Sequence, residues 1–233
     1  MTTTGEVHKG VMVWAVKNSV FLLIIALVII EGSGRLDWLM GWAYIVFMFV
    51  FVAVTGAVLY RLDPGLLAER SGPQEGSKRW DLALASLISV WLPLAICVIA
   101  ALDKRLGWSQ EIPPGAQAAG LALAAVGGLV IIWAMTANRY FSAVVRIQED
   151  RGHRVATTGP YRWVRHPGYA SMLLYYPGTA LALGSLWAFV PVALIIVLML
   201  LRTSLEDETL KKELPGYLDY TKKVKYRLIP GVW

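Results

Sequence analysis

Apolar runs of membrane length alternate with short polar segments along the whole chain. Four apolar runs precede a central polar segment, at residues 11–30, 38–59, 82–102 and 117–135. A fifth, longer apolar run follows that segment, at residues 170–201. A helix needs about 20 residues to cross the hydrocarbon core of a bilayer. Runs of this length without sustained alternation are typical of helices rather than strands. The pattern predicts an all-α fold, a polytopic transmembrane helix bundle.

The first run has an alternative interpretation as a cleaved signal peptide. Residues 19–30 have the length of a signal-peptide core, and the small residues Gly32-Ser33-Gly34 follow. We favour an uncleaved span, because the second run begins within a few residues and polytopic proteins commonly keep their first helix.

Two proline positions predict local features of the N-terminal half. Asp63-Pro64 fits the start of a helix, and Leu66-Leu67 gives that short helix an apolar side, as expected at a membrane interface. Pro93 lies inside the third run and predicts a kink there.

The last apolar stretch is too long for one straight span and contains Pro177, Gly184-Ser185 and Pro191. It is either one broken helix or two helices folded back at residues 183–185. With a hairpin there are six spans, and 19 of the 22 Lys and Arg residues fall on the side of the N-terminus. The positive-inside rule then places both termini and both polar segments in the cytoplasm. We therefore expect six spans, the last two as a helical hairpin.

The composition agrees with a membrane protein. Hydrophobic residues make up 57% of the chain and charged residues 16%, against about a quarter charged in soluble domains. We expect a single membrane-embedded domain over residues 1–233, with four spans in 11–136 and the catalytic core in 137–233. Membrane topology accounts for the net charge of +6, so no nucleic-acid partner is expected.

Motifs for several common cofactors are missing from the sequence. Gly32-Ser33-Gly34 does not complete a dinucleotide fingerprint and there is no P-loop, so no Rossmann sheet is expected. Cys97 is the only cysteine, and the three histidines lack spaced carboxylates. We expect neither a disulfide nor a metal site.

The polar segment at 138–169 contains six arginines and two of the three histidines. Pro167 fits the first turn of the helix that re-enters the membrane, so free N–H groups at that helix start lie beside Arg165 and His166. Such a setting suits an anionic group. The alternative is a basic connector that pairs with anionic lipid headgroups and has no chemistry.

Arg202 and Glu206 stand one helical turn apart where the last run leaves the membrane. They form either an ordinary surface pair or part of a site, because ionisable groups at the mouth of a bundle usually face its interior. We interpret the following charged residues as the solvated side of the same helix: Asp207, Glu208, Lys211 and Lys212.

Four motifs recur together in the C-terminal part of the chain. They are His153-Arg154-Val155-Ala156-Thr157-Thr158-Gly159-Pro160-Tyr161, Arg165-His166-Pro167-Gly168-Tyr169, Arg202 with Glu206-Asp207 and Leu210, and Pro215-Gly216-Tyr217 with Ile229-Pro230. In order and spacing they resemble the isoprenylcysteine carboxyl methyltransferase family of integral membrane enzymes that use S-adenosylmethionine. Residues 63–70 also look like a connector of bacterial members.

The resemblance implies a cytoplasmic cofactor pocket built from the polar connector, the start of the next helix and the C-terminal helix. Arg202 would be the catalytic residue that faces the methyl acceptor. Carried over by position, the cofactor-binding residues would be His153, Arg154, Val155, Ala156, Tyr161, His166, Pro167, Gly168, Tyr169 and Glu206. Two positions depart from the family: Arg146 stands where eukaryotic relatives have glutamine, and Asp207 replaces a glutamate.

These features predict an integral membrane methyltransferase with S-adenosylmethionine as methyl donor and a lipid-like or amphipathic small-molecule acceptor, such as an isoprenylcysteine-type carboxylate. Methyl transfer from a sulfonium mainly requires alignment and exclusion of water. Three alternatives remain open: methylation of a small thiol or amine, a membrane reductase that uses a nicotinamide cofactor, and a non-enzymatic protein that binds anionic membrane lipids.

Overall fold

The fold is a bundle of long helices. The computed structural model describes residues 4–71 and 76–233, and these residues contain no β-strand. The α-helices are α1 (Thr4–Ser33), α2 (Leu39–Leu62), α3 (Pro64–Glu69), α4 (Arg79–Ser86), α5 (Leu92–Leu106), α6 (Pro114–Ala137), α7 (Pro167–Ala182), α8 (Phe189–Glu213) and α9 (Tyr217–Lys223). The predicted all-α polytopic bundle is confirmed.

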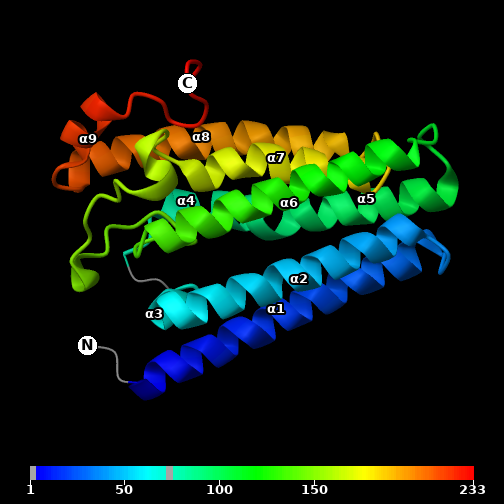
Figure 1. The fold of residues 1–233 in the computed structure, drawn as a ribbon, viewed down its shortest axis with the longest axis horizontal. Coiled ribbons are helices and arrows are strands. Elements are labelled where there is room, and N and C mark those ends of the chain that lie inside the picture. Colours follow the sequence, from blue (N-terminus) through cyan, green and yellow to red (C-terminus); the bar gives the residue numbers. More distant parts are fainter. Residues whose placement is uncertain (1–3, 72–75) are drawn as a thin grey trace.

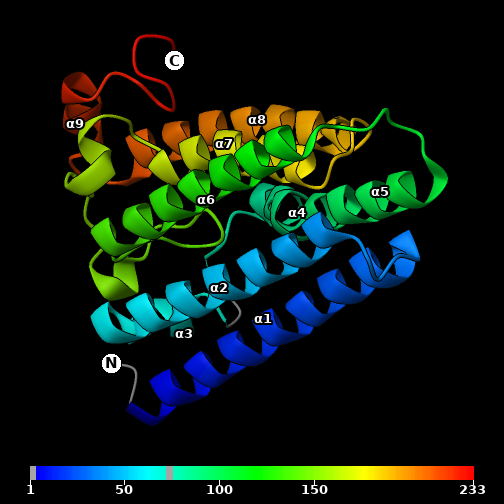
Figure 2. The same ribbon diagram turned by 45° about the vertical axis from the view of Figure 1, so that its right-hand side comes forward.

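The long helices lie side by side and alternate in direction (Figures 1 and 2). The start of α1, the short α3, the connector between α6 and α7, and α9 all lie at one end of the bundle. Only short loops lie at the other end, at residues 34–38, 107–113 and 183–188. The polar segments that carry the candidate site residues therefore meet at one end.

The last apolar stretch forms two helices rather than one. Helix α7 ends at Ala182, and the chain turns through Gly184, whose φ of 69° favours glycine, before α8 returns along the bundle. The predicted hairpin is confirmed. Within the described residues, five helical segments have the length and composition of membrane spans: α1, α2, the continuous segment Arg79–Leu106, α6 and α8. Helix α7 has 16 residues, or about 24 Å, so the six-span count stays a prediction.

The irregularity expected at Pro93 is a π-helical turn, Leu87–Trp91, between α4 and α5. Proline has no N–H group and its ring clashes with the carbonyl of the residue four positions earlier, which is Ser89. The hydroxyl of Tyr176 on α7 donates to the Ile88 carbonyl at 3.0 Å. The turn thus ties the third span to α7.

Helix α3 begins as predicted but is buried differently. The Asp63 carboxylate caps it by accepting a hydrogen bond from the Leu66 N–H at 3.1 Å. Leu66 and Leu67 are 0% and 1% exposed, so they do not face a membrane interface. They pack inside the bundle against Leu59 of α2 and partly buried residues of α1, because this position buries more apolar surface.

Candidate active site

The connector between α6 and α7 is fastened at both of its ends. The Asn138 amide donates to the Tyr161 hydroxyl at 3.2 Å, and the rings of Trp133 and Trp163 meet edge to face at 5.4 Å. The Tyr220 hydroxyl of α9 donates to the Tyr161 carbonyl at 2.7 Å. The connector is thereby fixed between α6, α7 and α9.

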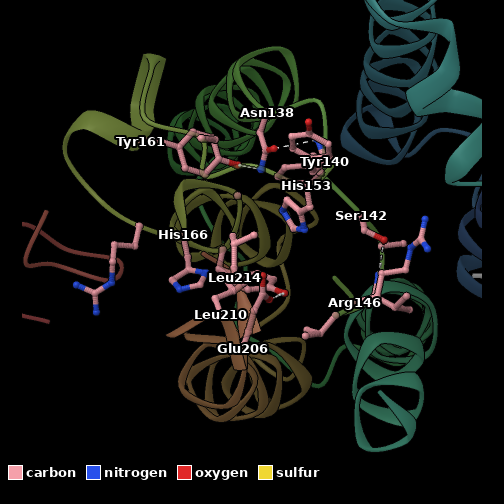
Figure 3. A pocket seen from close by; sticks show the side chains of 18 of the residues that line it. Asn138, Tyr140, Ser142, Arg146, His153, Tyr161, His166, Glu206, Leu210 and Leu214 are labelled. Carbon is pink, nitrogen blue, oxygen red and sulfur yellow. Dashed lines mark hydrogen bonds and ion pairs between the residues drawn. The ribbon is translucent and has the colours of Figure 1, made fainter. Parts of the chain in front are cut away.

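A cavity of about 200 Å³, partly open to solvent, lies under this connector. The candidate residues that line it are His153, Arg154, Val155, Ala156, Tyr161, His166, Gly168, Tyr169, Arg202 and Glu206. Figure 3 shows His153, His166 and Glu206, from three separate stretches, around this space. Pro167 is not in the cavity wall; it is the first residue of α7.

The start of α7 forms one side of the cavity. His166 precedes the helix, is 6% exposed, and its ring stacks on that of Tyr169 at 5.8 Å. A Cβ atom on Gly168 would lie 2.7 Å from the ring of Phe141, so only glycine fits without displacing that ring. The N–H groups of Tyr169 and Ala170 donate to the His166 carbonyl, and that of His166 donates to the Arg227 carbonyl. In the described part of the chain, the Gly168 N–H therefore remains available to an anion at this helix start.

Glu206 supplies a carboxylate from α8 on the facing side. Its Oε2 accepts a hydrogen bond from the Tyr169 hydroxyl at 2.5 Å, and its Oε1 lies 4.0 Å from Nδ1 of His166. The side chain keeps 22% of its surface exposed. It can accept further hydrogen bonds from a cationic ligand group.

Arg202 lines the cavity, but its guanidinium is held by Asp81 of α4. Nε donates to Oδ1 at 2.6 Å and Nη2 to Oδ2 at 2.9 Å. Nη2 also donates to the Ala143 carbonyl at 2.8 Å, and the guanidinium lies 5.2 Å from the centre of the Tyr169 ring. Among the described residues, Nη1 of Arg202 has no hydrogen-bond partner.

Asp81 was not among the site residues that the sequence motifs predicted. It is fully buried and lies 121 positions from Arg202. A signal was present, since Asp81 is an acidic residue directly before the third apolar run. The rule that directs ionisable groups at a membrane boundary toward the bundle interior applies to it as it does to Arg202.

The interpretation of Asp207 as solvated is wrong: its exposed fraction is 0%. Its Oδ1 and Oδ2 accept hydrogen bonds from Nε and Nη2 of Arg165 at 2.8 and 3.1 Å. Tyr217, Lys211 and Arg227 donate to the same carboxylate at 2.9 to 3.1 Å. Four positive or hydroxyl donors compensate the desolvation of one carboxylate, so Asp207 joins α8 to α9, the C-terminal tail and the connector.

His153 contributes a neutral ring to the cavity. Burial, together with the charges of Arg146 and Arg151, lowers the pKa of His153 to about 4. Its Nδ1 accepts a hydrogen bond from the Gln148 N–H at 3.3 Å, and its ring lies 4.6 Å from that of Tyr140. The flat, uncharged surface of these two rings suits an aromatic ligand group.

Arg146 also lines the cavity, in the position that departs from the family pattern. Its Nη2 lies 2.9 Å from Oε1 of Glu69, and its Nη1 lies 3.5 Å from Oδ1 of Asp150. Its charge is therefore compensated within the protein.

A second cavity of about 150 Å³ lies between α1, α2, α5, α6 and α7. Its wall is mostly apolar and aromatic, with Tyr44, Phe51 and Tyr175 among the larger side chains. Ser89, Ile131 and Met172 line both cavities. The two spaces therefore adjoin, one lined by charged groups and the other by apolar groups.

Comparison with known proteins adds an independent observation. A family model described as phospholipid methyltransferase matches residues 116–215. The chain is 38% identical over 65 residues to a probable protein-S-isoprenylcysteine O-methyltransferase of Oryza sativa subsp. indica, covering 28% of this chain and 34% of that protein. It is 27% identical over 145 residues to protein-S-isoprenylcysteine O-methyltransferase B of Arabidopsis thaliana, covering 61% and 70%.

A rat relative, the protein-S-isoprenylcysteine O-methyltransferase of Rattus norvegicus, is 30% identical over 115 residues, which are 46% of this chain and 39% of the relative. The chain thus matches about a third of the length of the rice protein. The chain is thus similar in its C-terminal half to a phospholipid methyltransferase family model, and over part of its length to proteins named protein-S-isoprenylcysteine O-methyltransferases.

Proposed function

We propose that this protein is an integral membrane methyltransferase that uses S-adenosylmethionine to methylate an amphipathic, lipid-like acceptor, namely an isoprenylcysteine-type carboxylate. One observation carries the proposal. Residues far apart in the sequence, from His153 to Glu206, line a single cavity that adjoins an apolar one. The named relatives are isoprenylcysteine O-methyltransferases, which supports the same substrate class.

The residues present fit the methyl donor. Glu206 offers a partly exposed carboxylate to the donor's ammonium group. The Gly168 N–H, in the first turn of α7, offers a hydrogen-bond donor to its carboxylate, and the rings of Tyr140 and His153 offer a flat surface to its base. When bound, the donor supplies an activated methyl group, which passes to an acceptor oxygen as the methyl–sulfur bond breaks with its electron pair left on sulfur.

The chain's own residues would orient the acceptor and exclude water. Arg202 has a hydrogen-bond donor left over, Nη1, in the wall of the cavity, and a guanidinium suits a carboxylate. The adjoining apolar cavity gives an acyl or prenyl chain a place to lie. A carboxylate needs no general base, because it is already a nucleophile at neutral pH.

The decisive measurement is calorimetric binding of S-adenosylmethionine to purified protein in detergent. Glu206→Gln and His166→Ala should each weaken binding about 10- to 100-fold, as expected for loss of a hydrogen bond to a charged group. Glu208→Gln is the matched control, because Glu208 lies on the same helix, is exposed, and pairs with Lys211 outside the cavity. It should bind like the wild type.

Equal affinity in all four proteins would remove the assigned donor site. A wild type without saturable binding would favour the non-enzymatic, lipid-binding alternative. If the donor binds, offering a prenylated cysteine beside a small thiol and a small amine identifies the acceptor class by which product carries the methyl group.

A further inference from the structure

Arg70 directly follows α3 and lines the large cavity from the N-terminal half of the chain. None of the motifs that predicted the donor site includes it. Its Nη1 donates to the Phe141 carbonyl at a long 3.4 Å, and its guanidinium lies 5.5 Å from the centre of the Phe141 ring. These contacts hold the side chain in place but bring no negative charge to it.

The charge of Arg70 is uncompensated, unlike that of Arg146 and Arg202, two buried arginines of the cavity wall. Arg146 pairs with Glu69, and Arg202 pairs with Asp81. No carboxylate within the described part of the chain forms an ion pair with Arg70. Burial, together with the charge of Arg202, lowers the pKa of Arg70 to about 10. Half-buried charges are normally paired. The unpaired guanidinium of Arg70 therefore favours binding of an anionic ligand group at this wall of the cavity.

Arg70 and Arg202 line the same cavity, and the charge of Arg202 contributes to the lowered pKa of Arg70. Asp81 pairs with Arg202 and forms no ion pair with Arg70. Nη1 of Arg202 has no hydrogen-bond partner among the described residues. Two arginines from segments far apart in the sequence can therefore donate to one anionic group in the cavity.

We infer that Arg70 is an acceptor-binding residue that holds the carboxylate of the methyl acceptor together with Arg202. The inference rests on the proposed methyltransferase function and names a residue of its acceptor site. The donor's own carboxylate is the competing source of an anion. The acceptor is favoured because Ser89, Ile131 and Met172, in the same cavity wall, also line the apolar cavity. An amphipath with one anionic end fits both spaces at once.

The test compares Arg70→Gln with the wild type in steady-state methylation of a prenylated cysteine. The KM for the acceptor should rise about 10- to 100-fold, because a hydrogen bond between two charged groups is lost. The calorimetric Kd for S-adenosylmethionine should stay unchanged. Arg61→Gln is the matched control, because Arg61 is an exposed arginine at the end of α2 and should behave like the wild type.

A second measurement separates a carboxylate contact from a merely structural role. The prenylated cysteine and its uncharged amide are compared as competitive ligands. Wild-type protein should prefer the carboxylate, and Arg70→Gln should lose about 10-fold or more of that preference. Arg70→Lys keeps the charge without the planar fork and should retain an intermediate preference. If Arg70→Gln does not fold, the preference of Arg70→Lys decides.

Three outcomes would overturn the inference. An unchanged preference for the carboxylate in both Arg70 variants shows that Arg70 does not hold it. A weakened Kd for S-adenosylmethionine with an unchanged KM for the acceptor assigns the anion to the donor. A wild type that neither binds the donor nor methylates the acceptor removes the proposed function itself, whereas failure of the Arg70 variants alone leaves that function standing.

Discussion

At the scale of single residues, the position of Arg202 is set by a carboxylate that does not itself reach the cavity. Asp81 is fully buried and absent from the cavity wall. It holds Arg202 by two hydrogen bonds and also accepts the Val145 N–H at 2.6 Å. One side chain of α4 therefore fixes both the proposed acceptor-binding arginine and the backbone of the connector. Asp81 is a positioning residue.

We predict that Asp81→Asn lowers turnover much more than donor affinity. The amide keeps the shape of Asp81 but leaves the Arg202 charge unpaired, and breaking a buried ion pair from one side costs about 3–5 kcal/mol of stability. In the folded fraction, kcat should fall about 10-fold or more, while the Kd for S-adenosylmethionine changes little. The measurement is kcat per folded protein, with Asp81→Glu restoring part of it.

Asp103→Asn is the control for this prediction. Asp103 is 3% exposed and accepts hydrogen bonds from Ser109 and Ser185 at the opposite end of the bundle. Its replacement should lower stability and leave kcat per folded protein intact. An equal loss of kcat in the two variants would show that Asp81 contributes only to folding.

At the scale of elements, α6 and α7 touch backbone to backbone. A Cβ atom on Gly178 of α7 would lie 2.6 Å from the Ala124 nitrogen and 2.7 Å from the Gly120 carbonyl oxygen of α6. One on Gly127 would lie 2.8 Å from the Ser171 carbonyl oxygen. Small residues allow membrane helices to approach this closely. The connector above the cavity runs from the end of α6 to the start of α7. The close packing of α6 against α7 therefore sets the distance between the two ends of the connector.

We predict that Gly178→Ala destabilises the protein and weakens donor binding. The added methyl group meets backbone atoms that cannot move aside alone, and overpacking typically costs about 1–3 kcal/mol. Spreading α6 from α7 also pulls the two ends of the connector apart. Thermal unfolding and S-adenosylmethionine titration measure the two effects. Gly115→Ala near the start of α6 is the control, because no atom lies within 4 Å of a Cβ there. Equal unfolding temperatures for the two variants would contradict the prediction.

The helices themselves were predictable, because a run of about 20 apolar residues has few other structures in a membrane. The hairpin at Gly184 was predictable for a different reason, the distribution of positive charge. The π-helical turn before Pro93 and the burial of Leu66 and Leu67 were not. Both depend on contacts with neighbouring helices, such as the hydrogen bond that the Tyr176 hydroxyl of α7 donates to the Ile88 carbonyl.

At the scale of the whole molecule, the sequence predicted the part of the candidate site that lies in the C-terminal half but not the part that lies in the N-terminal half. Motifs of the C-terminal half predicted the residues from His153 to Glu206 that line the cavity, together with Arg202. The contributions of the N-terminal half, Arg70 and Asp81, were not predicted. Asp81 meets Arg202, and Arg70 reaches the same cavity, only through packing between distant segments. A contact across 121 positions leaves no periodic pattern in a single sequence.

The arrangement of the whole chain predicts that both termini lie on the cytoplasmic side. Helix α7 carries the chain away from the end that holds the candidate site, and α8 brings it back (Figures 1 and 2). That end contains segments with 19 of the 22 Lys and Arg residues, and positive loops stay in the cytoplasm.

In a bacterial inner membrane, a fluorescent protein fused to the C-terminus should fluoresce and alkaline phosphatase fused there should be inactive. Phosphatase inserted in the loop at residues 107–113, at the opposite end, should be active. Active phosphatase at the C-terminus would mean that α7 does not cross the bilayer, and the connector would then lie across the membrane from α9, which the hydrogen bond from Tyr220 to Tyr161 does not allow.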